Sequence, residues 1–296
     1  MQRSIHVRTG AGVAPATGEH RPGAMPVPPI RLLGARRLGA GTREATLQYR
    51  KGWALLAYLA VERQRHPRAR LAAMFWPELG ETAALTNLRQ VLSDLNRAMG
   101  IAVGEGVLLI DRESVRLCPM ASAGLFDVDL LDAGAVGMAV GGSGEAHGWL
   151  ADAGDLLEGL ALDACVAFSD WLACTREWAA RRVAAGLAQL RDGAAARGER
   201  RLALVLARRL VGQDPWNELH HRVLMRLHLQ AGEPGMALAC YQQLVHRLKM
   251  DLGEAPSRET AEMAESIRVA GRRQAAVAWQ SRSAREPARQ VLALGG

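Results

Sequence analysis

The sequence has little of what membrane and secreted proteins require. It contains no apolar stretch of about twenty residues and no long apolar run near its start, so neither a membrane span nor a secretory signal is expected. Its four cysteines form no CxxC pair, which suits a reducing compartment. We therefore predict a cytoplasmic, nucleoid-associated protein without a membrane partner.

The sequence also lacks the common catalytic and metal-binding motifs. It has neither a GxxxxGK phosphate loop nor a GxSxG elbow, and Gly142, Gly144 and Gly148 neither match GxGxxG nor follow an apolar strand. His220 and His221 are adjacent on a predicted helix, so their rings point in different directions, and no acid or cysteine completes a ligand set. We expect no enzyme, no cofactor and no metal.

Charge is distributed unevenly along the chain. Residues 30–117 carry fourteen Arg and Lys against eight Asp and Glu, whereas residues 118–165 carry no Arg or Lys at all. A basic surface concentrates phosphate-bearing ligands and makes their binding sensitive to salt. Within the acidic stretch, residues 133–148 are rich in Gly and Ala and are predicted to form a flexible loop. The first half is therefore the candidate nucleic-acid-binding part.

Residues 81–100 predict an amphipathic helix. One side carries apolar residues at helical spacing, namely Leu85, Leu88, Leu92, Leu95 and Met99. The other side is polar and carries Thr82, Thr86, Arg89, Gln90, Ser93, Asn96 and Arg97. Thr82 is predicted as the N-cap and Gly100 as the C-terminal stop. Arg suits guanine, Gln and Asn suit adenine, and Ser and Thr adapt to either, so this face fits base edges; the alternative is an ordinary solvated face.

The neighbouring segments favour DNA binding. Two shorter helices are predicted at residues 51–62 and 69–77, joined by a turn at residues 65–68, with a second turn at residues 77–80. Downstream, residues 107–110 and 114–117 flank a tight hairpin, and upstream residues 30–39 and 45–50 predict short strands. This order is typical of a winged helix-turn-helix domain. Basic residues predicted to grip the DNA backbone are Lys51, Arg63, Arg65, Arg68, Arg70, Arg112 and Arg116; the alternative is a role in solubility alone.

The second half contains an internal repeat with an offset of 34 residues. The sequence Leu190, Gly198, Glu199, Ala203, Leu204, Leu210 and Val211 recurs as Leu224, Gly232, Glu233, Ala237, Leu238, Leu244 and Val245. Thirty-four residues is the length of a tetratricopeptide helix pair, and such pairs stack into binding surfaces rather than catalytic sites. Phe168, Trp171 and Trp178 are predicted to pack against a neighbouring helix; the alternative to a repeat is a generic helical bundle.

These segments resemble a known family. RKGWALLAYLAV, FWPE and NLRQVLSDL resemble the OmpR-like winged helix of the SARP-type transcriptional activators, and FSDWLACTREW followed by DPWNE…HRVLMRL resembles the bacterial transcriptional activator domain (BTAD) that follows it there. The resemblance implies activation through promoter DNA and RNA polymerase, and base contacts from Thr86, Arg89, Gln90, Ser93 and Arg97. The rival hypothesis is a tetratricopeptide-type adaptor or small-ligand sensor that does not bind DNA.

The expected organisation follows from these patterns. We predict a mainly α protein in which an α+β winged-helix domain precedes an all-α, tetratricopeptide-like domain. The predicted segments are a disordered start at residues 1–29, the winged helix at 30–119, an acidic connector at 120–165, the helical domain at 166–270 and a basic tail at 271–296. The expected partners are double-stranded promoter DNA, RNA polymerase and a second copy of the chain.

Overall fold

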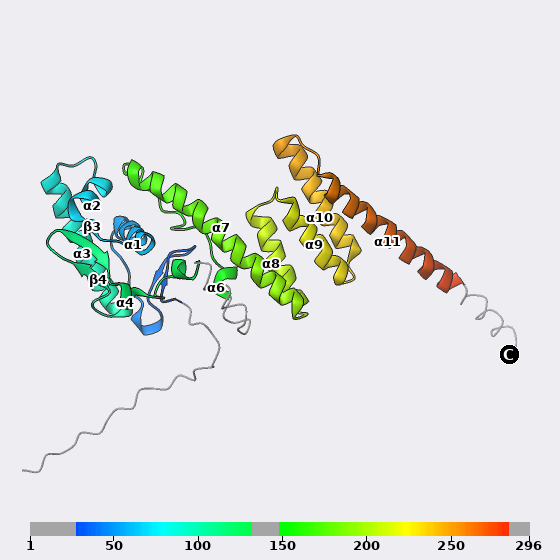
Figure 1. The fold of residues 1–296 in the computed structure, drawn as a ribbon, viewed down its shortest axis with the longest axis horizontal. Helices are drawn as coiled ribbons and strands as arrows, with labels where there is room; N and C mark the ends of the chain where they lie inside the picture. Colours follow the sequence, from blue (N-terminus) through cyan, green and yellow to red (C-terminus); the bar gives the residue numbers. More distant parts are fainter. Residues whose placement is uncertain (1–27, 132–147, 284–296) are drawn as a thin grey trace, which may run out of the picture.

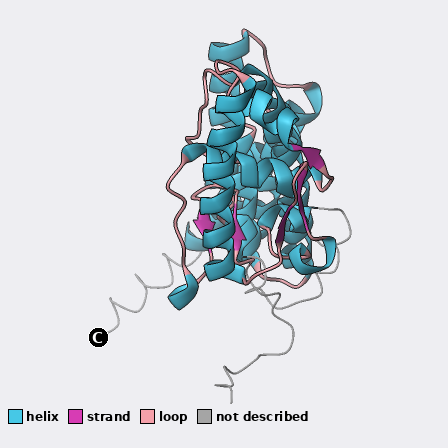
Figure 2. Ribbon diagram, turned by 90° about the vertical axis from the view of Figure 1, so that its left-hand side faces the viewer, coloured by secondary structure: helices cyan, strands magenta, loops and turns pink. Residues whose placement is uncertain are grey.

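The computed structural model describes residues 28–131 and 148–283. The described chain is mainly helical, as predicted, and its few strands are short (Figure 2). The short strands and the first three helices lie at one end, and the long α7 leads from them to a layer of antiparallel helices (Figure 1).

The amino-terminal part contains two small sheets and three helices. Its elements are β1 (Ile30–Arg31), β2 (Arg37–Leu38), η1 (Gly41–Arg43), α1 (Arg50–Glu62), β3 (His66–Pro67), α2 (Arg68–Phe75), α3 (Glu81–Val103), β4 (Leu108–Ile110), β5 (Ser114–Leu117), α4 (Pro119–Ser122) and η2 (Asp127–Leu131). β1 pairs antiparallel with β2, and the second sheet has the order β3-β5-β4. The predicted hairpin is therefore present as β4 and β5.

The carboxy-terminal part is helical. It comprises α6 (Gly148–Ala151), α7 (Val166–Ala196), α8 (Arg200–Gln213), α9 (Glu218–Gln230), α10 (Pro234–Arg247), the π-helical turn η4 (Leu248–Leu252) and α11 (Arg258–Ser283). Gly198 and Gly232, the equivalent glycines of the repeat, both have φ +78° and end the first helix of each pair. Ala203 and Ala237, also equivalent, are fully buried where the second helix packs closely on the first. The repeat thus forms the two predicted helix pairs.

The third helix is longer than the sequence predicted. Gly80, not Thr82, is its N-cap, and the helix begins at Glu81, whose negative charge suits a helix N-terminus. It continues through Gly100 and ends at Gly104, which has φ +101°. The prediction of a stop at Gly100 was wrong because Ala102 is buried in the core, so packing extends the helix by another turn.

Two local predictions around the sheets were also wrong. Residues 65–68 do not form a simple turn, because His66 and Pro67 pair with Val115 and Ser114 of β5. The extended conformation that proline imposes on the preceding residue suits a strand as well as a turn. Residues 45–50 form no strand: Ala45 makes a single bridge to Leu38, and the Gln48 N–H donates to the carboxylate of Asp94.

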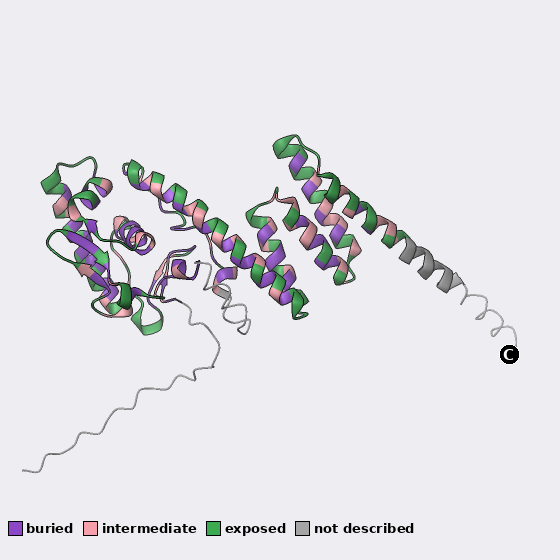
Figure 3. Cartoon of the chain, in the orientation of Figure 1, coloured by how far each residue is buried: buried purple, intermediate pink, exposed green. Residues whose placement is uncertain are grey.

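One hydrophobic core joins the winged-helix part to the beginning of the helical part. The core runs from Ile30 through α1–α3 and includes the inner face of α7 (Figure 3). Phe168 of α7 is fully buried, with its ring centroid 5.1 Å from that of Phe75 in α2. Trp171 lies 4.9 Å from the Tyr58 ring, and its indole N–H donates to Glu62 of α1 at 2.7 Å. Phe168 and Trp171 therefore pack on neighbouring helices, as predicted, and these helices belong to the amino-terminal part.

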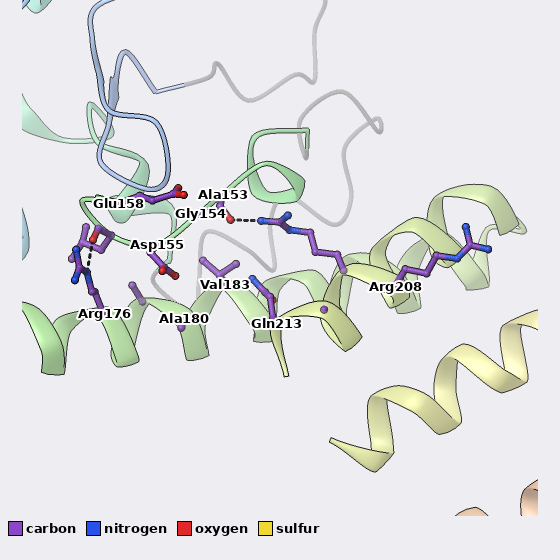
Figure 4. Close-up of a pocket in the computed structure, with 13 residues that line it drawn as sticks. Ala153, Gly154, Asp155, Glu158, Arg176, Ala180, Val183, Arg208 and Gln213 are labelled. Atoms are coloured by element: carbon purple, nitrogen blue, oxygen red, sulfur yellow. Dashed lines mark hydrogen bonds between the residues drawn. The ribbon is translucent and has the colours of Figure 1, made fainter. Parts of the chain in front are cut away.

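The loop before α7 is held by arginines from both parts of the chain. Arg36 and Arg50 donate to the carbonyls of Glu158 and Ala161. From α7, Arg176 donates to the carbonyls of Leu156, Leu157 and Leu160. From α8, Arg209 donates to the carbonyl of Ala153, across a cleft of about 520 Å³ (Figure 4). Guanidinium groups thus satisfy backbone acceptors that an irregular loop leaves unpaired, and they tie the two parts together.

Within the amino-terminal part, η2 is bonded to the segment after β1 through Asp127, which is 1% exposed. Its carboxylate accepts the N–H groups of Leu32 and Leu33, at 2.9–3.0 Å, and so fixes the chain just after β1. Burial raises the pKa of Asp127 to about 6, and the two N–H groups only partly oppose this effect. A carboxyl group whose pKa is higher in the folded than in the unfolded state stabilises the fold most when it is protonated.

This raised pKa predicts a pH-dependent contribution to stability. The contribution is fully present below the unfolded pKa near 4 and is lost as pH rises through about 6. We expect the free energy of unfolding of the native protein, measured relative to Asp127→Asn, to increase by about 1–2 kcal/mol between pH 7 and pH 5. Urea denaturation of both proteins at each pH measures this difference. Asp155→Asn, at an exposed position, is the control, and a difference that does not change with pH would contradict the assignment.

Candidate nucleic-acid interface

The polar face of α3 is open to solvent. Leu88, Leu92, Leu95 and Met99 are at most 2% exposed and seat the helix in the core. All six predicted contact residues on the opposite side are exposed, namely Thr82, Thr86, Arg89, Gln90, Ser93 and Arg97. The structure therefore places these side chains on a free surface, although their contacts with DNA remain a prediction.

Some side chains of this face form hydrogen bonds within the protein, and others have donors and acceptors that are free. Arg89, Gln90 and Ser93 make no side-chain hydrogen bond or ion pair within the described part of the chain, so their donors and acceptors are available. The Thr86 hydroxyl donates to the carbonyl of Thr82 at 2.9 Å. Arg97 donates to Asp94 at 2.7 Å, and Asp94 is 8% exposed. Arg89 is thus the guanidinium on this face that no carboxylate of the described chain compensates.

Asp94 also bonds to the backbone before α1, in addition to Arg97. Its second oxygen accepts the Gln48 N–H at 2.9 Å, which ties the residues just before α1 to the middle of α3. Asp94, the acid that the sequence placed on the polar side, is buried and pairs with Arg97, so it compensates the charge of Arg97 and leaves that of Arg89 uncompensated. Its position sets the orientation of α3 relative to α1.

Gln90 and Lys51 border a groove beside the polar face. The groove also involves Tyr49, Trp76 and Asn87. The Lys51 ammonium lies 3.7 Å from a Glu78 oxygen and 4.8 Å from the centroid of the Trp76 ring. The positive charge of Lys51 is therefore partly balanced within the protein, and its contact with the DNA backbone stays a prediction.

The wing is organised around Asp111. One oxygen of this carboxylate accepts the N–H groups of Glu113 and Ser114, and the other accepts the Ser114 hydroxyl at 2.7 Å and the Arg65 guanidinium at 2.9 Å. These hydrogen bonds, led by that of the Ser114 hydroxyl, lower the pKa of Asp111 to about 2. Arg68 donates to the Asp111 carbonyl at 3.3 Å. The hairpin turn and the start of α2 are thus held as one unit.

The basic residues around this unit fall into three groups. Arg112 at the hairpin tip and Arg116 on β5 are exposed and form no ion pair with any described residue. Arg65 and Arg68 hold the wing, and Arg65 still exposes 61% of its side chain. Arg63 is different: it bonds to Ser122 and Asp129 and lies over the Phe126 ring, so it has a structural role, and its contact with DNA stays a prediction.

Sequence reasoning missed Asp111 as the organising residue of the wing. An Asp at the first position of a tight turn is a known signal for such side-chain-to-backbone bonds. The base contacts implied by the resemblance also leave out Asn96, which is exposed on the same helix as Arg89 and Ser93. Among the described residues, no group of three His, Cys, Asp or Glu side chains could hold a metal ion, and no helix is long and apolar enough to cross a membrane.

Comparison with known proteins identifies a domain and a shared fold. A family model described as the bacterial transcriptional activator domain matches residues 128–268. Among solved structures, the fold is similar to that of Mycobacterium tuberculosis EmbR in complex with a low affinity phosphopeptide, with a TM-score of 0.55 and 19% sequence identity. Residues 128–268 therefore match the bacterial transcriptional activator domain, which supports the resemblance to the SARP-type transcriptional activators. No curated protein matches it.

The matched domain begins earlier in the chain than the predicted helical domain at residues 166–270. The family model begins at Val128, within the segment that the sequence predicted to be a connector, and therefore includes η2 and α6 as well as the helices from α7 onward. The alignment with EmbR covers 80% of this chain but 64% of that one, so the chain spans less than two thirds of the EmbR chain. At 19% identity the likeness shows the shared fold of winged part and helices.

Proposed function

We propose that this chain is a SARP-type, sequence-specific DNA-binding transcriptional activator of the cytoplasm. The observation that carries the proposal is the polar face of α3, which leaves Arg89, Gln90 and Ser93 unpaired while the opposite face is buried. A helix seated in this way enters the major groove with its side chains free to meet base edges. Promoter DNA is then the first partner and RNA polymerase the second.

The contacts divide into two kinds. Arg89 and Ser93, with Thr86 and Gln90 beside them, read bases, because they project from α3 with capacity left for hydrogen bonds. Arg112 and Arg116, on the wing, grip phosphates, since no carboxylate among the described residues compensates their charge. Arg68 supports this contact by holding the wing turn. The helical domain takes no part in base reading and supplies the surface for RNA polymerase.

The proposal is tested by selecting duplexes from a random library and measuring their affinity for the full chain at several salt concentrations. If about six phosphates are neutralised, affinity falls by roughly a thousandfold between 50 and 200 mM salt. Transcription in vitro from a promoter that carries the selected site then tests activation by RNA polymerase. Failure to retain any duplex at low salt would favour the adaptor hypothesis, and reduced transcription would identify a repressor.

A further inference from the structure

An exposed apolar surface surrounds the start of α9. We name it the α9–η4 patch, and it consists of Trp216 (46% exposed), Leu219 (56%), Met250 (67%) and Leu252 (53%). The indole N–H of Trp216 donates to Asp251 at 3.1 Å, which brings the segment before α9 against η4. Large apolar side chains gathered on a surface typically mark an interaction site, and an anchored tryptophan is a frequent centre of such sites.

The backbone under this patch is fixed rather than loose. Glu218 of α9 accepts the N–H and the hydroxyl of Ser257, at 2.6–3.0 Å, so the segment between η4 and α11 is fastened to the start of α9. The side chain of Asn217 caps α9 and also donates to Asp214 at 3.1 Å. The patch is therefore a preorganised surface, which lowers the entropic cost of binding.

Two carboxylates belong to the segments that carry Trp216 and its hydrogen-bond partner. Asp214 accepts from Asn217 and Asp251 accepts from Trp216 itself, and both donors are neutral. Neither carboxylate forms an ion pair with an Arg or Lys of the described chain. An exposed indole that contacts one uncompensated carboxylate, with a second two residues before it in sequence, favours an arginine, whose guanidinium stacks on the ring and reaches the oxygens. The patch thus fits a segment in which arginine precedes aliphatic residues.

The chain itself contains such a segment. Residues 284–296, AREPARQVLALGG, carry Arg285 and Arg289 followed by Val291, Leu292 and Leu294, and they lie beyond the described residues. We propose that the α9–η4 patch binds residues 284–296 of a second copy of the chain. Each copy then donates one segment and receives one, which closes a symmetric dimer with two equivalent contacts.

Geometry favours exchange between copies over binding within one chain. The patch lies where α11 begins, and the 26 residues of α11 lead away from it over about 39 Å (Figure 1). Thirteen extended residues span at most about 45 Å, so a return to the patch of the same chain would use the whole segment as a connector. A direct patch-to-patch dimer would instead bring Asp214 and Asp251 against their own copies, which like charges disfavour.

The test measures the mass of the full chain by light scattering over a range of concentrations, with and without a synthetic peptide of residues 284–296. We expect a dimer that excess peptide converts to monomers. Trp216→Ala weakens the dimer about tenfold or more. Asp251→Asn retains an acceptor for the Trp216 N–H but removes the charge, so it weakens the dimer and reduces its salt dependence.

The matched control is Met236→Ala, which removes an exposed apolar side chain from the other end of α10 and leaves the dimer intact. A peptide with Arg289→Ala should compete poorly. The proposal is overturned if the chain is monomeric at all concentrations, or if a dimer is unaffected by the peptide and by both patch variants. Binding of another protein at the patch without exchange of residues 284–296 also overturns it.

Discussion

Replacement of Phe168 by alanine is expected to lower the free energy of unfolding by about 3–5 kcal/mol. The side chain is fully buried, with its ring 5.1 Å from Phe75 and 5.4 Å from Trp171. Truncation removes this apolar contact and leaves a cavity that the neighbouring helices cannot fill without moving. Urea denaturation followed by far-UV circular dichroism and tryptophan fluorescence measures the loss.

The control lies two residues earlier in the same helix. Val166 is 65% exposed, so Val166→Ala should change stability by less than about 0.5 kcal/mol. A loss below about 1 kcal/mol for Phe168→Ala would show that the beginning of α7 is not part of the amino-terminal core. A large loss means instead that the winged-helix part would be incomplete if it were cut before α7.

Replacement of Arg89 by alanine is expected to weaken binding to the selected DNA site by about 1–3 kcal/mol, or roughly 5- to 150-fold. Arg89 is the guanidinium on the polar face of α3 without a carboxylate partner among the described residues, so its donors are free to contact a base. Binding to unrelated duplex should change little, and preference should relax at one base position. Affinities for a set of single-base variants of the site measure both effects.

Two variants separate base reading from general attraction. Arg201→Ala removes the same charge from an exposed position of α8, away from the wing, and should leave binding unchanged. Arg112→Ala, at the wing tip, should weaken binding to all sequences equally and reduce the salt dependence by about one phosphate. If Arg89→Ala behaved like Arg112→Ala, Arg89 would be a phosphate contact, and if it had no effect α3 would not be the reading helix.

The arginines that join the two parts of the chain bear on both expected results. Arg50 lies at the start of α1 and holds the carbonyl of Ala161, while Gln48, two residues before it, bonds to Asp94 of α3. The loop before α7 is therefore linked to α3 through the short segment of residues 48–50, because one end of this segment bonds to Ala161 and the other to Asp94. A change in the helical part that moved this loop would also move the residues that orient α3.

Sequence alone predicted the elements that depend on local periodicity. The apolar spacing from Leu85 to Met99 predicted the buried side of α3 and its exposed polar face, because a helix places every third or fourth residue on one side. The 34-residue repeat predicted two helix pairs with glycine at the turns and alanine at the close contacts, because these residues meet a steric demand wherever they occur. The family resemblance rested on the same segments.

Tertiary structure decided what local patterns leave open. Burial of Ala102 moved the end of α3 from Gly100 to Gly104, and pairing with β5 made His66 and Pro67 a strand. Only the folded chain showed that Lys51 forms an ion pair with Glu78 and that Arg63 forms one with Asp129. It also showed that the Asp111 carboxylate accepts hydrogen bonds from within the hairpin turn and from Arg65. These outcomes depend on which charged groups meet across long sequence separations, and a helical or strand period contains no information about such pairings.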